Sequence, residues 1–343
     1  MENLTIWLQA LPAATADKLA RLFLAPASST SLLSLAVAFC IAALFLVRRR
    51  PTGRPPLKAR ALVRALLPAR ILKSRSTRTD IGFFLFNSFL YVSLFGWAVL
   101  SGGAVREAVG GGLEALFGGP LAVTPPAWLV LAIATPILFL AAEFSYWLIH
   151  YLLHRVPFLW AFHQVHHSAE VLTPATNFRV HPVETIAFAN LLAVVMGTTN
   201  AVLDQLLGGP ADPMVVGGRN GLALGAFYLL AHLQHSHMWI TFPGWLGRTF
   251  YSPAHHQIHH STDPAHFGTN LGSFVLIWDR LFGTHYPPPA ARPRNLTFGV
   301  EPVTAAQQTI TGALLTPFAD AWRTLRPPAP TPEPAARPAP ARS

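Results

Sequence analysis

The chain has 343 residues, of which 52% are hydrophobic and 12% are charged, about half the charged fraction of an ordinary soluble domain. This composition excludes a typical soluble globule and indicates an integral membrane protein. The only cysteine, Cys40, lies in an apolar run. A single cysteine excludes an internal disulfide framework, a thiolate metal cage and an iron–sulfur cluster, because each of these needs several.

The net charge of +10 is distributed unevenly. Eleven of the 25 Lys and Arg residues lie between Arg48 and Arg78, directly after an apolar stretch. This placement is typical of a basic cytoplasmic loop beside a membrane helix, and it favours anionic lipid headgroups as the partner. We therefore expect no nucleic-acid binding.

The predicted elements start with an N-terminal interfacial segment at 1–30, which lacks the basic n-region of a signal peptide. A first transmembrane helix and the basic loop follow at 31–79, then a membrane domain at 80–290. The C-terminal segment at 291–343 ends in a Pro-rich disordered tail. A spanning helix needs about 20 apolar residues, and the candidates are 31–47, 81–100, 128–153, 185–203 and 222–235. The last two are diluted by Gly, Asn and Thr.

We predict an all-α fold, an integral membrane helical bundle with four or five transmembrane helices. If the loop at 48–78 is cytoplasmic, the third helix ends on that side and the fifth returns the chain to it. Every histidine cluster then lies on one side. This predicts a histidine-lined metal site on the cytoplasmic side of a bacterial inner membrane.

All 15 histidines lie between His150 and His285. Three clusters stand out, "HYLLH" at 150–154, "HQVHH" at 163–167 and "HQIHH" at 256–260, and residues three or four apart share a helix face. Buried imidazoles without partners cost about 1–3 kcal/mol each, and a bound metal removes that cost. The isolated His266 and His285 are instead expected to be hydrogen-bonded core residues.

The clusters supply eight histidines, and His235 at the end of the fifth helix makes nine. One ion takes about four to six ligands, so nine imidazoles predict two adjacent ions. Zinc, copper, iron and nickel all suit imidazole ligands. The "HExxH" zinc protease signature does not occur in the sequence, and a haem would use only two axial histidines.

In chain order, "EFSYWLIHYLLHRVPFLWAFHQVHHS", "RVHP", "SPAHHQIHHS" and "NLGSFVLIWDRLFGTH" resemble the fatty acid hydroxylase/sterol desaturase superfamily of integral membrane di-iron enzymes, over roughly residues 80–290. The detail is most similar to the alkylglycerol monooxygenase branch and to bacterial sterol desaturase-like members. Tyr151, Gln257 and His237 depart from the usual residues, which leaves subfamily and substrate open. The resemblance implies these iron ligands: His150, His154, His163, His166, His167, His235, His256, His259 and His260.

Several histidines are further candidates for ligands or for the layer around them. His232 or His237 would be a tenth ligand or would replace His235. His255 matches no ligand of the motif and is expected behind the ligands. Arg179 and His181, in "FRVHP", are expected either near the site or in a turn.

Two carboxylates and four aromatic residues each have two interpretations. Glu143 lies seven residues before His150 on the same helix face, where it would accept a ring N–H or be an interfacial charge. Asp279 would orient a ligand or pair with Arg280. The aromatic residues would line an acyl channel or, as the favoured interpretation, pack at the membrane interface: Tyr146, Trp147, Trp160 and Phe162.

The resemblance implies an O2-dependent di-iron monooxygenase that hydroxylates or desaturates a lipid such as an acyl chain, an alkyl lipid or a sterol. Such a site must be dry and close to the bilayer. The sequence has no dinucleotide fingerprint. We therefore expect an external electron donor, such as a ferredoxin, a cytochrome or a reductase, with the basic loop as one docking surface.

Two other classes of protein remain open at this point. A zinc-dependent membrane hydrolase would need a nearby carboxylate base such as Glu143 or Glu170. A non-catalytic metal-binding or transport protein would carry its ligands along the depth of the membrane.

Overall fold

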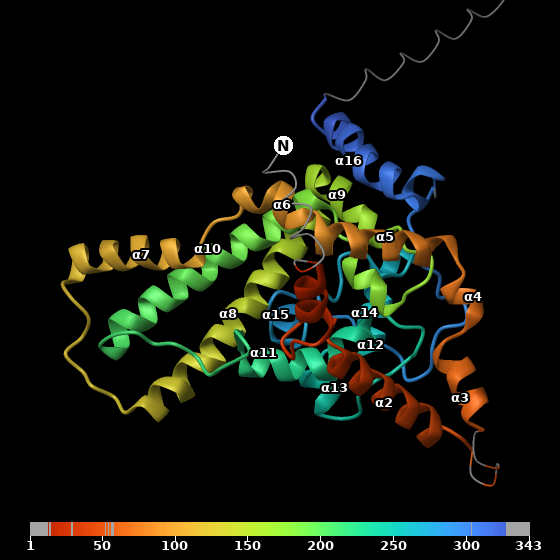
Figure 1. The fold of residues 1–343 in the computed structure, drawn as a ribbon, viewed down its shortest axis with the longest axis horizontal. Helices are drawn as coiled ribbons and strands as arrows, with labels where there is room; N and C mark the ends of the chain where they lie inside the picture. Colours follow the sequence, from red (N-terminus) through yellow and green to blue (C-terminus); the bar gives the residue numbers. More distant parts are fainter. Residues whose placement is uncertain are drawn as a thin grey trace, which may run out of the picture.

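The computed structural model describes residues 13–326 apart from positions 14, 29, 52, 54, 56, 57 and 303. Within this part of the chain the fold is helical, as predicted, with one two-stranded hairpin. Residues 1–12 of the predicted interfacial segment and the predicted disordered tail from Pro327 onward lie outside the described residues. Figure 1 shows an elongated lobe of helices attached to a wider body.

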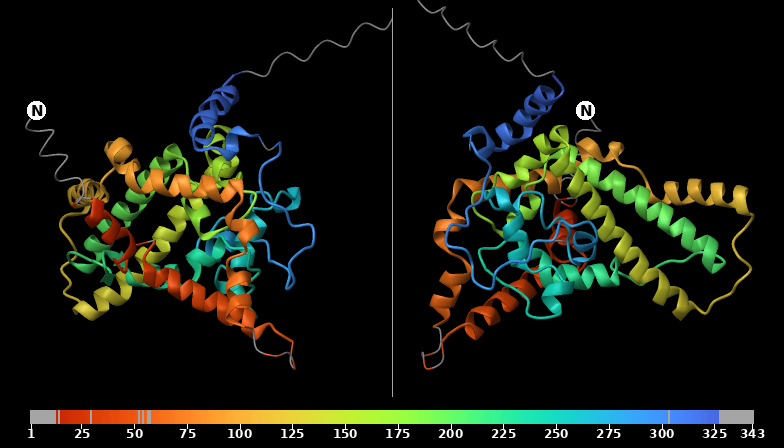
Figure 2. Two further views of the ribbon diagram at one scale, coloured as in Figure 1. Left: turned by 45° about the vertical axis from the view of Figure 1, so that its right-hand side comes forward. Right: turned by 180° about the vertical axis from the view of Figure 1, so that it is seen from behind.

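The lobe is built on α8 (Ala127–Arg155) and α10 (Pro182–Leu207). They are antiparallel, because Leu203 near the end of α10 packs against Ala134 and Leu138 near the start of α8. Figure 2 shows them side by side from the body to the tip of the lobe. Both are long and apolar enough to span a membrane, and the 29 residues of α8 extend about 43 Å. The third and fourth predicted helices are thus present.

A third helix, α7 (Gly102–Phe117), lies against α10. At Gly197 an added Cβ would lie 2.7 Å from the carbonyl oxygen of Gly102 and 2.7 Å from Cβ of Val105. Only glycine permits this close approach. The Arg106 side chain also pairs with Asp204 of α10 at 2.6 Å, so α7 is fixed along the lobe.

The prediction of one continuous helix over 81–100 is wrong. The chain forms α5 (Arg75–Phe89), then α6 (Tyr91–Phe95) and η1 (Gly96–Ala98), before α7 begins. The axis bends by 56° between the α5 stretch and the stretch that ends with α7. The Ser101 hydroxyl accepts the backbone N–H of Ala104, a side-chain cap that starts α7 as a separate helix.

The first and fifth predicted helices are short. The helix α2 (Leu32–Arg48) has 17 residues. The fifth is divided into α11 (Gly221–Ala226), the π-helical η3 (Phe227–Ala231) and α12 (His232–Gln234). In the described residues two helices are long and apolar enough to cross a membrane, or three if the bent pair counts as one span. The number of crossings stays a prediction.

Short elements complete the body. The basic stretch after α2 contains α3 (Ala59–Leu66) and α4 (Ala69–Leu72), and the hairpin pairs β1 (Val215–Val216) with β2 (Arg219–Asn220). The cluster at 150–154 lies on α8, and the other two lie on α9 and at α14. Further segments of the body are α9 (Pro157–His167), η2 (Pro174–Phe178), α13 (Leu246–Thr249), α14 (Pro253–His259), η4 (Pro264–His266) and α15 (Ile277–Leu281).

The C-terminal segment contributes structure that the sequence patterns did not predict. After η5 (Ala306–Gln308), the helix α16 (Ile310–Thr324) packs against α9. Ala321 contacts Ala161 and Phe162, and the Gln164 amide donates to Asp320 Oδ2 at 3.0 Å. Residues beyond 290 therefore support the helix that carries "HQVHH".

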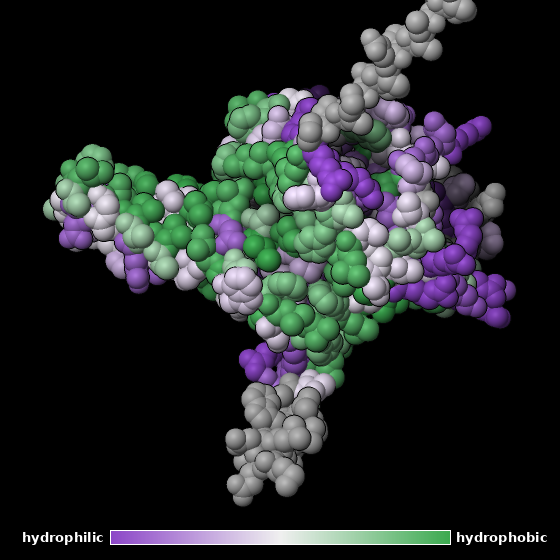
Figure 3. All heavy atoms as spheres, turned by 90° about the horizontal axis from the view of Figure 1, so that it is seen from above, coloured by the Kyte–Doolittle hydropathy of each residue, from purple (hydrophilic) through white to green (hydrophobic). Residues whose placement is uncertain are grey.

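Hydrophobic residues cover much of the surface. Figure 3 shows them over the lobe and the adjoining body, whereas hydrophilic residues gather at the opposite end. On the lobe, Leu206 is 52% exposed, Trp128 is 68% exposed and Leu131 is 42% exposed. An apolar surface of this extent indicates contact with a membrane.

Candidate metal centre

Nine buried or half-buried histidines gather in two groups, and within each group the ligand nitrogens lie within 4.8 Å of one another. The groups adjoin, because the ring centroids of His167 and His260, one from each, are 4.5 Å apart. They comprise the nine positions singled out in the sequence. The five-histidine group is His150, His154, His163, His167 and His259, and the four-histidine group is His166, His235, His256 and His260.

The repeated motif divides its rings between the two groups. In α9, His163 and His167 belong to the five-histidine group and His166 to the four-histidine group. In α14 the division is reversed: His256 and the helix-ending His260 join the four-histidine group, whereas His259 joins the other. On an α-helix, positions i and i+4 differ by about 40° and i+3 lies on the other side of i. One motif can therefore serve two centres.

The other three rings come from different elements. His150 and His154 lie four residues apart in the last turns of α8, so both face α9 and α14. His235 directly follows α12, where the helix ends with φ −93° and ψ 69°. The π-helical turn before it shifts the helix register. His235 Nε2 lies 2.8 Å from Nε2 of His256 and 3.1 Å from Nε2 of His166.

The four-histidine group has its Nε2 atoms turned toward one point. His235 Nε2 also lies 3.1 Å from His260 Nε2, and His260 Nε2 lies 3.1 Å from His256 Nε2. A neutral imidazole has one N–H and one acceptor nitrogen, so a single nitrogen cannot form proper hydrogen bonds to three others. Neighbouring ligands about 2.1 Å from an ion are about 3 Å apart. The spacing therefore fits a shared cation.

Three rings of the five-histidine group have an acceptor outside the group on Nδ1. His150 Nδ1 lies 2.8 Å from the carbonyl oxygen of Leu271, and His259 Nδ1 lies 2.9 Å from that of Thr269. An acceptor on one ring nitrogen fixes the tautomer and leaves the other free for a metal. The buried Nε2 atoms of His154, His167 and His259 have no hydrogen-bond partner among the described residues.

Glu184 is a candidate site residue that the sequence interpretation missed. It lies in the first turn of α10, is 3% exposed, and its Oε1 is 2.9 Å from His163 Nδ1. It follows "RVHP" by two residues. A carboxylate at the start of a long apolar helix is itself a signal for a functional role, and that signal would have identified it.

The two carboxylates that were predicted to act near the ligands, Glu143 and Asp279, accept hydrogen bonds from backbone N–H groups rather than from a histidine ring. Glu143 Oε2 accepts the N–H groups of Phe274 and Val275 at 2.7 and 3.0 Å. Asp279 accepts the N–H groups of Leu271 and Gly272 at 2.7 and 2.8 Å. Both expectations for Glu143 are therefore wrong, because it is buried and bonded to a loop. Asp279 contacts no ligand ring directly. It holds the loop whose Leu271 carbonyl oxygen lies against the His150 ring.

Arg280 does not pair with Asp279 and instead donates to the carbonyl oxygen of Arg248 at 2.9 Å. Arg179 is fully buried and pairs with Asp80 at 3.1 Å. Its guanidinium also donates to the carbonyl oxygen of Val165 and to the Ser168 hydroxyl. Arg179 thereby fixes the end of α9 beside the rings.

The four remaining candidate histidines lie outside both groups. His181 caps α10 through Nδ1, and its Nε2 lies 3.0 Å from the carbonyl oxygen of Leu314. His232 Nε2 contacts the Ser34 hydroxyl at 3.0 Å, and His237 Nε2 lies 2.8 Å from the carbonyl oxygen of Ala65. His255 Nδ1 contacts Ser252, the cap of α14. The idea that His232 or His237 replaces His235 is therefore wrong.

The isolated histidines also differ from expectation. His266 Nδ1 and His285 Nε2 have no hydrogen-bond partner among the residues that the structure describes. The His266 ring instead packs on Tyr286, with centroids 4.8 Å apart, and the His285 ring packs on His255 at 5.6 Å.

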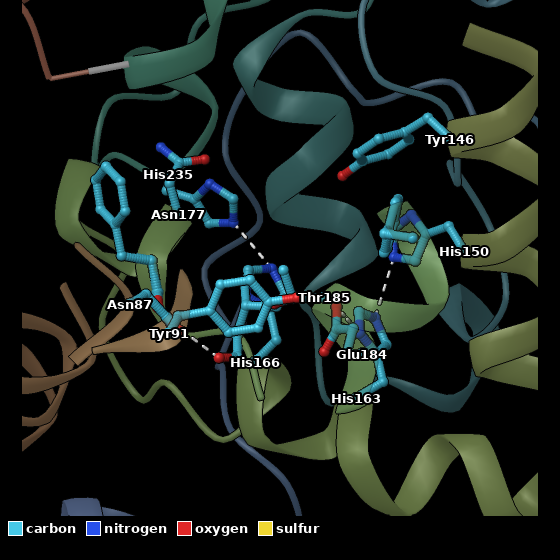
Figure 4. Close-up of a pocket in the computed structure, with 13 residues that line it drawn as sticks. Asn87, Tyr91, Tyr146, His150, His163, His166, Asn177, Glu184, Thr185 and His235 are labelled. Atoms are coloured by element: carbon cyan, nitrogen blue, oxygen red, sulfur yellow. Dashed lines mark hydrogen bonds and ion pairs between the residues drawn. The ribbon is translucent and has the colours of Figure 1, made fainter. Parts of the chain in front are cut away.

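A cavity of about 380 Å³ adjoins both groups. Figure 4 shows ring edges of His150, His163, His166 and His235 turned into it. Tyr146 lines it, whereas Trp147 and Phe162 are buried by packing. Its other lining residues are Asn87, Tyr91, Asn177, Phe178, Val180, Glu184, Thr185 and Phe188. Trp160 packs on His154 and His167 at 5.1 and 5.3 Å.

Burial keeps the rings neutral. It lowers the pKa of His166 to about 3 and that of His259 to about 4. Neutral imidazole is the form that binds a metal. Nine neutral nitrogen donors in two adjacent sets fit two ions of the borderline class that includes iron and zinc.

The part of the chain that carries the histidine groups is similar to a known family. Residues 135–284 match the model of the family described as fatty acid hydroxylase. This stretch contains all nine grouped histidines, so the resemblance inferred from the histidine motifs is confirmed.

The relatives that the chain matches are named as a hydroxylase and as monooxygenases. Ornithine lipid hydroxylase OlsE of Rhizobium tropici is 33% identical over 159 residues, covering 46% of this chain and 43% of that protein. Alkylglycerol monooxygenases are similar at 26% identity in Caenorhabditis elegans and 28% in Danio rerio, covering 43% of this chain and 27% and 30% of those proteins. The chain spans less than half the length of these curated relatives. No solved structure matches it.

Proposed function

We propose that this protein is an O2-dependent di-iron oxygenase of the membrane that hydroxylates a lipid. The observation that carries the proposal is the pair of adjacent imidazole groups beside one cavity, within the stretch that matches the fatty acid hydroxylase family. The named relatives, an ornithine lipid hydroxylase and alkylglycerol monooxygenases, support hydroxylation over desaturation.

The five-histidine group would hold one iron and the four-histidine group the other. When bound, the two irons supply the reduction of dioxygen and the oxidising power for a C–H bond. The protein supplies the rest. Glu184 and the carbonyls of Leu271 and Thr269 fix ring tautomers, and Phe178, Val180 and Phe188 give the cavity an apolar wall that excludes water.

Placement in the membrane supports access to a lipid. The C-terminal end of α8 and the N-terminal end of α10 meet at the site, and both helices are long and apolar enough to span a bilayer. We propose that the site lies at the cytoplasmic end of this pair, because the basic residues at 48–78 favour that side. An external ferredoxin, cytochrome or reductase would supply electrons.

The two alternatives are less well supported by the geometry. A zinc hydrolase was expected to use Glu143 or Glu170, but Glu143 is bonded to backbone N–H groups and Glu170 is exposed. A transport protein was expected to spread its ligands through the membrane depth, whereas nine rings lie in two adjoining groups.

The test is lipid mass spectrometry of cells with and without the gene, grown in air. We expect a lipid that gains one oxygen atom only when the gene is present. Metal analysis of the purified protein should give about two irons per chain. An unchanged lipid profile, or stoichiometric zinc with hydrolysed lipid and no oxygen requirement, would contradict the proposal.

A further inference from the structure

Three residues that line the cavity beside the imidazole groups each have a polar atom without a hydrogen-bond partner among the described residues. Asn87 Oδ1, Tyr91 Oη and Glu184 Oε2 are buried atoms without a partner among the described residues. Leaving such an atom unsatisfied costs about 1–3 kcal/mol. Three in one cavity indicate that a polar ligand completes them, and Figure 4 shows the three side chains around the same space.

The orientation of these atoms is fixed by their own contacts. The Asn87 amide nitrogen donates to the carbonyl oxygens of Phe178 and Val180 at 2.9 and 3.0 Å, so its Oδ1 is left as an acceptor. Glu184 uses Oε1 on the ring of His163, which leaves Oε2 as a second acceptor. The Tyr91 hydroxyl can donate or accept.

This pattern specifies the chemistry of a ligand. Two acceptors and one hydroxyl require a group with at least two N–H or O–H donors. A fatty acid carboxylate offers only acceptors and would meet the Glu184 carboxylate. A hydrocarbon segment offers no hydrogen-bonding group. The same cavity has ring edges of both histidine groups on its wall, so the group that fills it lies next to the proposed oxidation site.

We propose that Asn87, Tyr91 and Glu184 form a recognition site for a lipid head that carries at least two hydrogen-bond donors, such as an amide with a neighbouring amine or hydroxyl, or a diol. The carbon that is oxidised then lies within a few bonds of this head rather than in the middle of a chain. The inference rests on the proposed function for the identity of the reaction. Asn87 and Tyr91 lie outside the matched stretch 135–284, so the family match does not assign them.

Binding without turnover tests this site. The purified full chain, kept under nitrogen without reductant, is titrated by native mass spectrometry with a long-chain monoalkyl glycerol, an N-acylated amino alcohol, the di-O-methyl ether of the same alkyl glycerol, and the fatty acid of equal length. We expect each of the two donor-bearing lipids to bind about 10-fold or more tightly than the di-O-methyl ether and the fatty acid, from two hydrogen bonds. Which of the two donor-bearing lipids binds more tightly shows whether the site prefers hydroxyl or amide donors.

The isosteric Tyr91→Phe removes only the hydroxyl. It should weaken binding of the donor-bearing lipids by about 2–10-fold, the effect of one hydrogen bond, and leave the di-O-methyl ether unchanged. The control Tyr228→Phe deletes a hydroxyl that donates to the carbonyl oxygen of Pro26, outside the cavity, and should not alter this discrimination.

Equal affinity of the wild-type protein for the diol and its di-O-methyl ether would overturn the recognition site, whatever the variant does. Equal weakening of both lipids in Tyr91→Phe would also overturn it. If the protein discriminates between these lipids in binding but forms no oxidised lipid under air with reductant, the oxygenase proposal is contradicted. The recognition site is then still supported.

Discussion

The two histidine groups differ in what holds their rings. In the five-histidine group, Nδ1 of His150, His163 and His259 each meets an oxygen outside the group. In the four-histidine group the Nε2 atoms face one another, and the Nδ1 atoms of His235 and His260 have no hydrogen-bond partner in the described part of the chain.

The difference separates a preorganised site from one that needs its ion. Outer acceptors fix the tautomer and ring orientation before a metal arrives, and their loss typically costs 10–100-fold in metal affinity. Rings without such acceptors keep two tautomers available and must be ordered by the metal itself. We therefore expect the five-histidine group to bind its ion more tightly than the four-histidine group.

The largest effect is expected when one ring of a single histidine group is removed. His166→Ala removes a ring whose Nε2 faces His235 at 3.1 Å. The oxidised lipid should fall by at least about 100-fold, and bound metal should fall from about two ions per chain to about one. Lipid mass spectrometry and metal analysis measure both.

The matched control for His166→Ala is His285→Ala, because His285 lies outside both groups. This variant should keep its metal and its product. Full activity in His166→Ala would remove the four-histidine group from the proposed centre.

The second largest effect is expected from a change that disturbs both histidine groups. Arg179→Ala leaves Asp80 buried without its cation and releases the end of α9, which supplies rings to each group. Removing one partner of a buried ion pair costs about 3–5 kcal/mol. Denaturant titration should show this loss of stability.

A comparison pair on the surface calibrates the Arg179 result. Arg323 pairs with Asp320 at 2.6 Å, but its side chain is 72% exposed. Arg323→Ala should cause a much smaller change, because solvent screens exposed pairs. Equal effects of the two variants would mean that the Arg179 network does not support the fold.

Loss of an outer acceptor should make the five-histidine group behave like the other group. Glu184→Ala removes the oxygen that lies 2.9 Å from His163 Nδ1 and should lower metal affinity there by about 10–100-fold. Glu184→Gln keeps an acceptor oxygen and should lose much less. The exposed Glu170→Ala serves as the control in a competitive chelator titration, and identical affinity in Glu184→Ala would show that the contact does not orient the ring.

The smallest effect is the difference between the groups in the unaltered protein. Metal content followed against chelator concentration should fall in two phases separated by about tenfold or more. The first phase should be absent from His166→Ala, which has already lost the weaker ion. A single phase in the wild-type protein would mean that the outer acceptors make no difference.

Helical spacing made much of the site predictable. The i and i+4 positions of His150 with His154, and of His163 with His167, place each pair in one group. The same rule could not show that His166 and His259 cross to the other group, because that depends on how α9 and α14 are placed relative to each other. Glu184 was missed because its contact with His163 joins two helices.

The predicted membrane helices agree with the structure where one apolar run of the sequence forms a single helix. The 128–153 and 185–203 segments lie within single helices, α8 and α10. The 81–100 segment is also apolar, but α5 ends at Phe89 and the chain bends by 56° before it continues at Tyr91. Hydropathy sums over residues and does not detect where hydrogen bonding stops a helix. The recurrence of histidines at helical intervals was enough to predict a metal-binding pattern and the resemblance to a known family, since the sequence itself contains side-chain type and short-range spacing. Which rings share an ion, which oxygens hold them and which atoms remain open to a lipid were decided only by tertiary packing, because each of those contacts joins residues from separate helices and loops.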